Sequence, residues 1–177
     1  MKNLRHLALI SGIAAVLSAV AFNPKAQAET KDINFSGTIA RICTFGANTD
    51  GVLAAGDGWV EGTTGIPSLN TGTAGSITLS CNGYATVSAG LPVRLSAPIG
   101  FIDPHRQSVV YDTETQQHAS NYTGTRFWTN YYATNLTIPA DTSRTFRVGM
   151  SAGSQGTAGN VVAGTYTYKV TVTATPN

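Results

Sequence analysis

The sequence predicts an all-β domain built as a sandwich of short strands. Apolar residues recur with a period of two along several segments, Gly-rich or Asn-Gly turn signals separate those segments, and no convincing 3.6-residue period of an amphipathic helix is present. The chain has 177 residues, of which 42% are hydrophobic and 11% charged. This length and apolar content suit one folded domain with one core and argue against disorder.

The first 28 residues predict a secretory signal peptide. Lys2 and Arg5 precede an uncharged apolar run over residues 7–22, and Ala26-Gln27-Ala28 offers a small-residue cleavage site. The apolar run is shorter than the ~20 residues that a membrane-spanning helix needs. We therefore expect cleavage after Ala28 and export of residues 29–177.

Cleavage would also change the charge of the protein. The full chain carries a formal charge of +2, and removal of Lys2, Arg5 and Lys25 leaves 8 basic against 9 acidic residues, or −1. A near-neutral domain lacks the basic surface that nucleic-acid binding requires. No second apolar segment is long enough to enter a membrane, so no direct membrane insertion is expected after cleavage.

The two cysteines, Cys43 and Cys81, both lie in the expected mature part. In an exported protein an even pair most simply forms a disulfide. Closing a loop of this length would stabilise the fold by about 4 kcal/mol in the chain-entropy model. No histidine lies near either cysteine in the sequence, so a metal site is not favoured and no cofactor is expected.

The first predicted strand covers residues 33–43. Ile33, Phe35, Gly37 and Ile39 alternate with small or polar residues, and Arg41 is the exception before Cys43. This apolar stripe begins almost at the mature terminus. It either forms the first strand of its own sandwich or fills the groove of another molecule as an added strand.

The middle of the chain predicts further strands separated by turns. Residues 44–75 are Gly-rich, with short strands or turns pinned by Val52, Leu53, Trp59, Val60, Ile66 and Leu69. Asn82-Gly83 is a turn signal. Alternating, β-branched or aromatic residues predict strands at 77–81, 84–95, 107–111, 125–132, 136–138 and 145–150.

The last predicted strand has the clearest alternation. One face carries threonines and Lys169, whereas the other is apolar and consists of Tyr166, Tyr168, Val170, Val172 and Ala174. With the segments before it, this strand brings the expected total to about eight, which is typical of a β-sandwich.

Three segments resemble chaperone–usher pilins, and most of all their archaic, spore coat protein U-like branch. Phe35-Ser-Gly-Thr-Ile39, which leads to Cys43, resembles the start of these pilins. Residues 76–83 resemble the strand that bears their second cysteine, and residues 163–173 are similar to their terminal strand.

The resemblance implies an immunoglobulin-like sandwich that lacks its final strand, so that an apolar groove stays open. In such pilins a periplasmic chaperone lends a strand to the groove, and an outer-membrane usher exchanges it for the N-terminal extension of the next subunit. The implied division is a signal peptide over 1–28, a donor extension over 29–40 and a pilin domain over 41–177. The implied location is the periplasm and then a fimbrium on the cell surface.

The resemblance also implies site residues. Ile33, Phe35 and Ile39 would fill pockets of the neighbouring subunit, and Gly37 would lie where the backbone passes close to the groove wall. The residues implied to line the acceptor groove are Tyr166, Tyr168, Val170 and Val172.

Two other function classes remain open. Asp103, His105, Asp112 and His118 could serve acid–base or metal chemistry, although Asp-Pro is also a common turn and no phosphate-binding or nucleophile motif is present. We do not expect an enzyme. A monomeric carbohydrate-binding sandwich is the stronger alternative, since aromatic residues stack on sugar rings; the candidates are Trp59, Tyr122, Phe127, Trp128, Tyr131 and Tyr132.

Overall fold

The computed structural model describes residues 29–154 and 161–177, and the expected signal peptide over 1–28 lies outside the described residues. Residues 29–38 belong to one unit, and Ile39–Asn177 form another. The described residues form strands, turns and loops without any helix, which confirms the all-β prediction. Over these two ranges, consequently, no helix has the length and apolar character needed to cross a bilayer.

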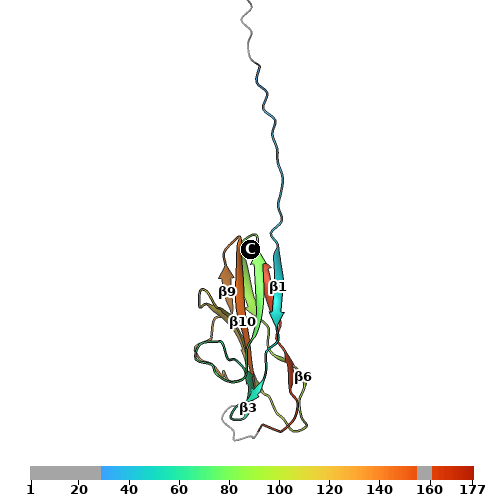
Figure 1. Cartoon of the computed structure of the whole chain (residues 1–177), viewed down its shortest axis with the longest axis vertical. Helices are drawn as coiled ribbons and strands as arrows, with labels where there is room; N and C mark the ends of the chain where they lie inside the picture. Colours follow the sequence, from blue (N-terminus) through green and yellow to red (C-terminus); the bar gives the residue numbers. More distant parts are fainter. Residues whose placement is uncertain (1–28, 155–160) are drawn as a thin grey trace, which may run out of the picture. The chain divides into compact units, whose positions relative to one another are not determined.

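The strands of the second unit are short, apart from one near the C-terminal end (Figure 1). In chain order they are β1 (Cys43–Thr49), β2 (Ala54–Ala55), β3 (Trp59–Gly62), β4 (Gly75–Cys81), β5 (Ala85–Ala89), β6 (Val93–Ser96), β7 (His105–Asp112), β8 (His118–Thr123), β9 (Asn135–Ile138), β10 (Thr142–Gly153), β11 (Thr167–Lys169) and β12 (Val172–Pro176).

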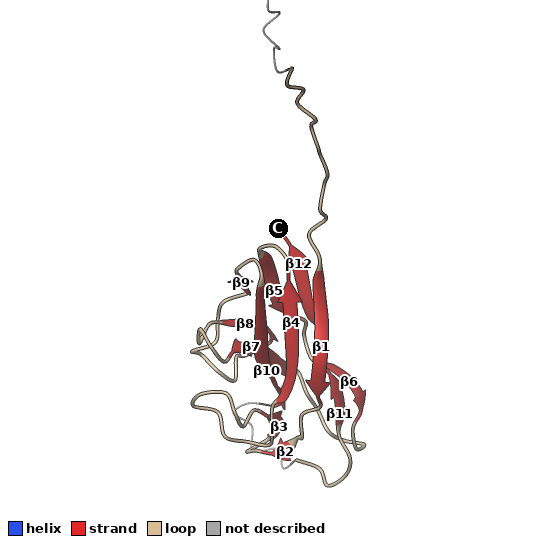
Figure 2. Ribbon diagram, turned by 45° about the horizontal axis from the view of Figure 1, so that its top comes forward, coloured by secondary structure: helices blue, strands red, loops and turns tan. Residues whose placement is uncertain are grey.

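The long strand β10 organises the larger sheet (Figure 2). On one side its first part, Thr142–Val148, pairs with β4, and its last part, Met150–Gly153, pairs with β3. On its other side β10 pairs with β7, which in turn pairs with β8. β1 extends the sheet beyond β4, and β2 pairs with β3; every one of these pairings is antiparallel.

Opposite this sheet, β5 pairs with β12 on one side and with β9 on the other. β6, which follows β5 in the chain, pairs with β11, which precedes β12. A backbone hydrogen bond of 2.8 Å from Gly90 N to Thr171 O spans the interruption between the two pairs. β11 and β12 therefore follow the course of a single last strand with a break at Val170–Thr171.

The main core lies between the two layers. Leu79 of β4, Val110 of β7 and Phe146 of β10 are fully buried against Val87 of β5 and Ile138 of β9. Along β5 and β9 the buried residues alternate with more exposed ones, whereas β7 is buried continuously from Gln107 to Asp112. The sandwich-like, all-β architecture predicted from the sequence is thus confirmed.

The predicted first strand is placed differently. No strand is assigned over residues 29–42, and Ile33, Phe35 and Ile39 are 75%, 93% and 87% exposed. Strand β1 begins at Cys43, where the prediction ended, and runs into the Gly-rich stretch. A strand needs a partner strand for its backbone hydrogen bonds, and none of the strand pairings among the described residues includes residues 29–42.

A second difference concerns residues 125–132, for which the strand prediction was wrong. They form turns and loop, whereas His118–Thr123, for which no strand was predicted, is β8. The amide of Gln107, which is fully buried, explains the loop: its Oε1 accepts hydrogen bonds from Phe127 N and Trp128 N, and its Nε2 donates to Trp128 O and Tyr131 O. One side chain thus satisfies backbone groups that a sheet would otherwise pair.

Candidate functional site

A cavity of about 1070 Å³ lies where the two layers separate at one edge of the fold. β1 forms one wall, and the segment from Val161 through β11 to Val172 forms the other. Cys43 contacts the same core cluster as Val172 and Ala174, so the two walls converge near the start of β1. The cavity extends from there toward residues 50–55 and Tyr166.

Both walls are strand edges. Among the described residues β1 pairs only with β4, β11 only with β6, and β12 only with β5. Each wall therefore offers a row of backbone N–H and C=O groups that no other described strand engages. Such an edge is a template for one more strand.

The four groove residues predicted from the sequence all line this cavity. Tyr166, Tyr168, Val170 and Val172 are half-buried, and the residues between them are exposed. Their apolar face is therefore only partly covered within the described residues. Whether they accept a donor strand stays a prediction.

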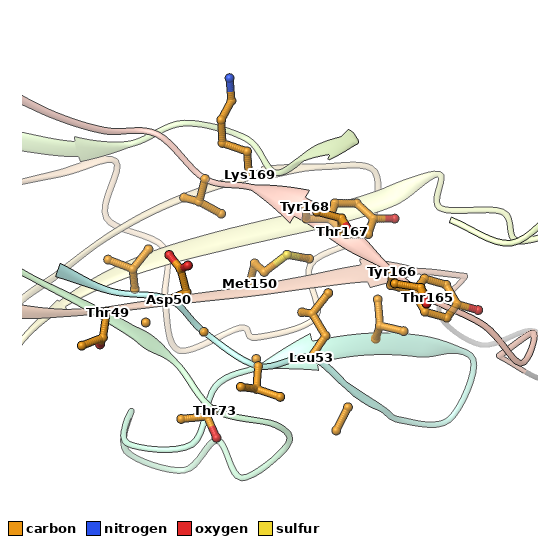
Figure 3. Close-up of a pocket in the computed structure, with 18 of the residues that line it drawn as sticks. Thr49, Asp50, Leu53, Thr73, Met150, Thr165, Tyr166, Thr167, Tyr168 and Lys169 are labelled. Atoms are coloured by element: carbon orange, nitrogen blue, oxygen red, sulfur yellow. The ribbon is translucent and has the colours of Figure 1, made fainter. Parts of the chain in front are cut away.

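The floor of the cavity comes from residues that sequence reasoning did not single out as a site. Figure 3 shows Met150 of β10 between Tyr168 of β11 and Leu53, which follows β1 in the chain. Val60 and Ile77 also line it. The sequence predicted strands over residues 77–81 and 145–150, which contain Ile77 and Met150, but nothing in it showed that their contacts would leave a space.

The wall at Tyr168 is held in place by polar contacts. The Tyr168 hydroxyl donates a hydrogen bond of 2.7 Å to Asp103 Oδ2, and Arg94 Nη1 lies 3.1 Å from Asp103 Oδ1. Burial, and then the hydrogen bond to the Asp103 carboxylate, raise the pKa of Tyr168 far above its ordinary value. The hydroxyl is consequently a permanent donor that ties β11 to the connection between β6 and β7.

Tyr166 is anchored in a similar way. Its hydroxyl donates a hydrogen bond to Val162 O, and its ring meets Phe101 edge-on at 4.8 Å between centroids. Burial raises the pKa of Tyr166. Both tyrosines thus present apolar ring surface to the cavity while their hydroxyls are engaged elsewhere.

The predicted donor residues lie in a stretch to which no strand is assigned. Ile33, Phe35 and Gly37 belong to the first unit, and Ile39 begins the second. The apolar side chains of this stripe are exposed to solvent.

The predicted disulfide is confirmed. Cys43 and Cys81 are bonded and lie directly opposite each other, as the first register pair of β1 and β4. The described residues contain no free cysteine. This bond joins the cavity wall to the interior of the larger sheet.

Asn82 has a role that the sequence did not reveal beyond a turn signal. Its Oδ1 accepts a hydrogen bond of 2.7 Å from Ile42 N, and its Nδ2 donates one of 2.9 Å to Ala40 O. Its backbone N also donates to Ile42 O at 3.1 Å. The Asn82 amide thus continues the β1–β4 ladder for residues that precede β1.

The acid–base candidates have structural partners. The Asp112 carboxylate accepts hydrogen bonds from Glu114 N and from the backbone and hydroxyl of Thr115, which closes the turn after β7. His105 Nδ1 accepts one from Thr125 N at 2.8 Å. His118 Nε2 accepts from the backbone that follows Tyr131, and burial lowers its pKa. Across the described part of the chain, no three metal-ligating side chains cluster.

The aromatic candidates for sugar stacking are dispersed. Trp128 and Tyr131 are buried in a core cluster, and Phe127 packs against it. Trp59 is half-buried beside Phe127, with ring centroids 5.9 Å apart. Only Tyr122 and Tyr132 of the six are exposed, and the Arg126 guanidinium lies 4.3 Å from the centroid of the Tyr122 ring.

Comparison of the chain with protein-family models, with curated proteins and with solved structures found no match. The functional reading therefore depends on the cavity, its two strand edges and the exposed stripe.

Proposed function

We propose that this protein is a structural subunit of a surface pilus that polymerises by donor-strand exchange and contributes to adhesion or biofilm formation. One observation carries the proposal: a cavity lies between two strand edges that no other described strand pairs with, along the apolar face of the last strand. An added strand would complete both sheets and cover that face.

The shape of the cavity suits a peptide strand better than a small ligand. The residues that would meet the occupant, Tyr166 to Val172, repeat every second position, which is the period of side chains on a strand. A small-molecule site would instead be expected to hold a few polar side chains that converge on one point. The wall residues 165–172 span roughly 26 Å at about 3.3 Å per residue.

The proposed occupant is residues 29–39 of another copy. Its apolar side chains Ile33, Phe35 and Ile39 are exposed and share the two-residue period, with Gly37 at the position between the last two. As an extended segment it would span roughly 36 Å, long enough for the whole cavity. Burying these three side chains would contribute about 1.5–3 kcal/mol each, in addition to the ladder hydrogen bonds.

In this proposal the sandwich is immunoglobulin-like and lacks its final strand, and Tyr166, Tyr168, Val170 and Val172 form the acceptor groove. The chain would be an archaic chaperone–usher pilin of the spore coat protein U-like branch. Its partners would be a periplasmic chaperone, an outer-membrane usher and neighbouring subunits. Export through a signal peptide agrees with the disulfide, which is typical of oxidising compartments.

The proposed contact is head-to-tail, because donor and acceptor are different surfaces of the chain. A heterologous contact that does not close into a ring produces an open filament. The alternative, a monomeric carbohydrate-binding module, has less support because four of its six candidate aromatics are buried or half-buried.

The test is peptide complementation. Residues 40–177, nearly the whole of the second unit, are purified, and their melting temperature is recorded with and without a synthetic peptide of residues 29–39. We expect a slow and essentially irreversible rise in melting temperature with the peptide. A peptide with Phe35→Arg should have no effect, because a charge would enter an apolar pocket.

The matched control is a peptide with Asn34→Arg, which adds the same charge on the opposite face of the strand. It should bind nearly as well as the unmodified peptide. A melting temperature that no peptide changes would contradict strand exchange and would direct attention to glycan binding.

A further inference from the structure

We propose that Asn82 is a positioning residue that keeps the N-terminal segment of the chain out of its own cavity, so that strand exchange takes place between copies. This inference rests on the proposed function and adds to it one residue. That residue decides between self-capping, in which the N-terminal segment of a chain fills the cavity of the same chain, and polymerisation. It follows from the topology of the strand ends and from the contacts of residues 39–42.

The strand ends determine what self-capping would require. Cys43 is opposite Cys81, and Pro176 is opposite Ala85, which follows Cys81 after a short turn. The start of β1 and the end of β12 therefore lie at the same end of the domain. To enter the cavity beside β1, the preceding segment would have to reverse direction within residues 39–42.

Asn82 opposes that reversal. Its side chain and backbone together make three hydrogen bonds to this short stretch, with Ala40 O, Ile42 N and Ile42 O. These bonds use the same backbone groups that a tight turn would need to reorient. They hold residues 40–42 extended alongside Asn82, in continuation of β1.

Two neighbouring contacts support the same course. Gly83 is buried, and a Cβ placed there would lie 3.1 Å from Cγ and Cδ of Arg41, so the Arg41 stem lies over this glycine. The residue after Ile42 is Cys43, the first residue of β1, and its disulfide with Cys81 fixes it to β4. The chain is thus held on both sides of Ile42.

Without such a device, self-capping would compete strongly. A tethered segment acts at an effective concentration in the millimolar range, far above that of free subunits in a dilute solution. Even a poorly matched intramolecular strand could then fill the cavity before another copy arrives. When residues 40–42 are held extended, the chain cannot reverse within residues 39–42 and enter its own cavity. The cavity is then left for a segment from another molecule.

The experiment compares the chain beginning at Glu29 in three forms: unchanged, Asn82→Ala and Asn82→Asp. Monomers are isolated by size exclusion, and hydrogen exchange of residues 32–39 and binding of a labelled peptide of residues 29–39 are measured on the same fraction. The aspartate variant keeps the acceptor for Ile42 N but loses the donor to Ala40 O.

We expect the unchanged monomer to exchange residues 32–39 at the rate of an unstructured peptide and to bind the labelled peptide. The Asn82→Ala monomer should protect these amides at least tenfold and bind several-fold less peptide, with Asn82→Asp in between. Should Asn82→Ala fail to fold, the aspartate variant alone decides between these results.

Two results would overturn the inference, and they are distinguishable. If the unchanged monomer binds peptide and both variants exchange and bind as it does, Asn82 has no positioning role although strand exchange stands. If the unchanged monomer does not bind the peptide, the proposed function fails and this inference fails with it.

Discussion

The Tyr168 hydroxyl donates a hydrogen bond to the Asp103 carboxylate at 2.7 Å and thereby joins the last strand to the connection between β6 and β7. Tyr168 also lines the cavity, so this bond sets the position of one wall. The Arg94 guanidinium forms an ion pair with the other oxygen of the Asp103 carboxylate. The first prediction tests how much this arrangement contributes.

Tyr168→Phe removes one hydrogen bond to a charged acceptor and keeps the ring. We expect the free energy of unfolding to fall by about 1–2 kcal/mol, the usual contribution of a bond of this type when partly exposed to solvent. Urea denaturation followed by far-UV circular dichroism provides the measurement. Tyr166→Phe, which loses only a bond to the neutral Val162 O, is the comparison and should cost less.

Phe35→Arg in the chain that begins at Glu29 should abolish polymer formation while leaving the domain folded. Because Phe35 is 93% exposed, its replacement should not disturb the folded domain. Analytical ultracentrifugation measures the polymer, and the disulfide and circular dichroism report the fold. Asn34→Arg, one residue away on the other face, should still polymerise; equal loss in both variants would contradict a face-specific contact.

Gln107→Leu should destabilise the fold by about 2–4 kcal/mol, because it leaves backbone groups of residues 127–131 buried without partners. The loop carries Trp128, which is 7% exposed. We therefore expect a red shift of tryptophan emission together with a lower melting temperature. An unchanged emission spectrum would show that the loop holds its place without the amide.

Acid should weaken the fold through His118. Burial lowers the pKa of His118 below its ordinary 6.5, so as the pH falls the unfolded chain takes up a proton before the folded one does. The free energy of unfolding should consequently decrease as pH drops through 6.5 toward the lowered pKa, and this contribution should be constant above 6.5.

The measurement for His118 is urea denaturation between pH 7.5 and 5, compared with His118→Gln. The variant should lose the step that begins near 6.5 and keep the changes due to carboxylates at lower pH. A step of the same size in both proteins would assign it to another group.

Reduction of Cys43–Cys81 should lower stability by about 4 kcal/mol in the chain-entropy model. The cysteines are 38 positions apart, and the loop they close contains β2, β3 and most of one cavity wall. The double replacement Cys43→Ser with Cys81→Ser is measured by urea denaturation under oxidising conditions. A loss far below the expected value would indicate that the loop stays ordered in the unfolded state.

The last strand illustrates what local pattern can predict. Alternation from Tyr166 to Ala174 correctly gave the inward and outward faces, since each residue's face depends only on the pleat of its own strand. The break at Val170–Thr171 did not follow from the pattern. The β-sandwich and the disulfide were predicted for the same reason: both depend on short-range pattern and on cysteine count.

Features that depend on distant residues were not predictable. The aromatic run from Phe127 to Tyr132 has strong strand propensity, yet Gln107, far away in the sequence, supplies its hydrogen bonds and makes it a loop. The cavity likewise depends on where β1 and β11 diverge, which no single segment encodes. The stripe from Ile33 to Ile39 has the pattern of a strand but no pairing among the described residues.

The disulfide also determines how the domain would bear tension. A pull on the chain before β1 would open the β1–β4 ladder from its end, one register pair at a time, and the first of these pairs is Cys43 with Cys81. A covalent bond at that pair removes the starting point for such peeling. Load applied through the N-terminal segment therefore passes directly into β4, in the interior of the larger sheet, and oxidation of two thiols sets the mechanical strength of the attachment.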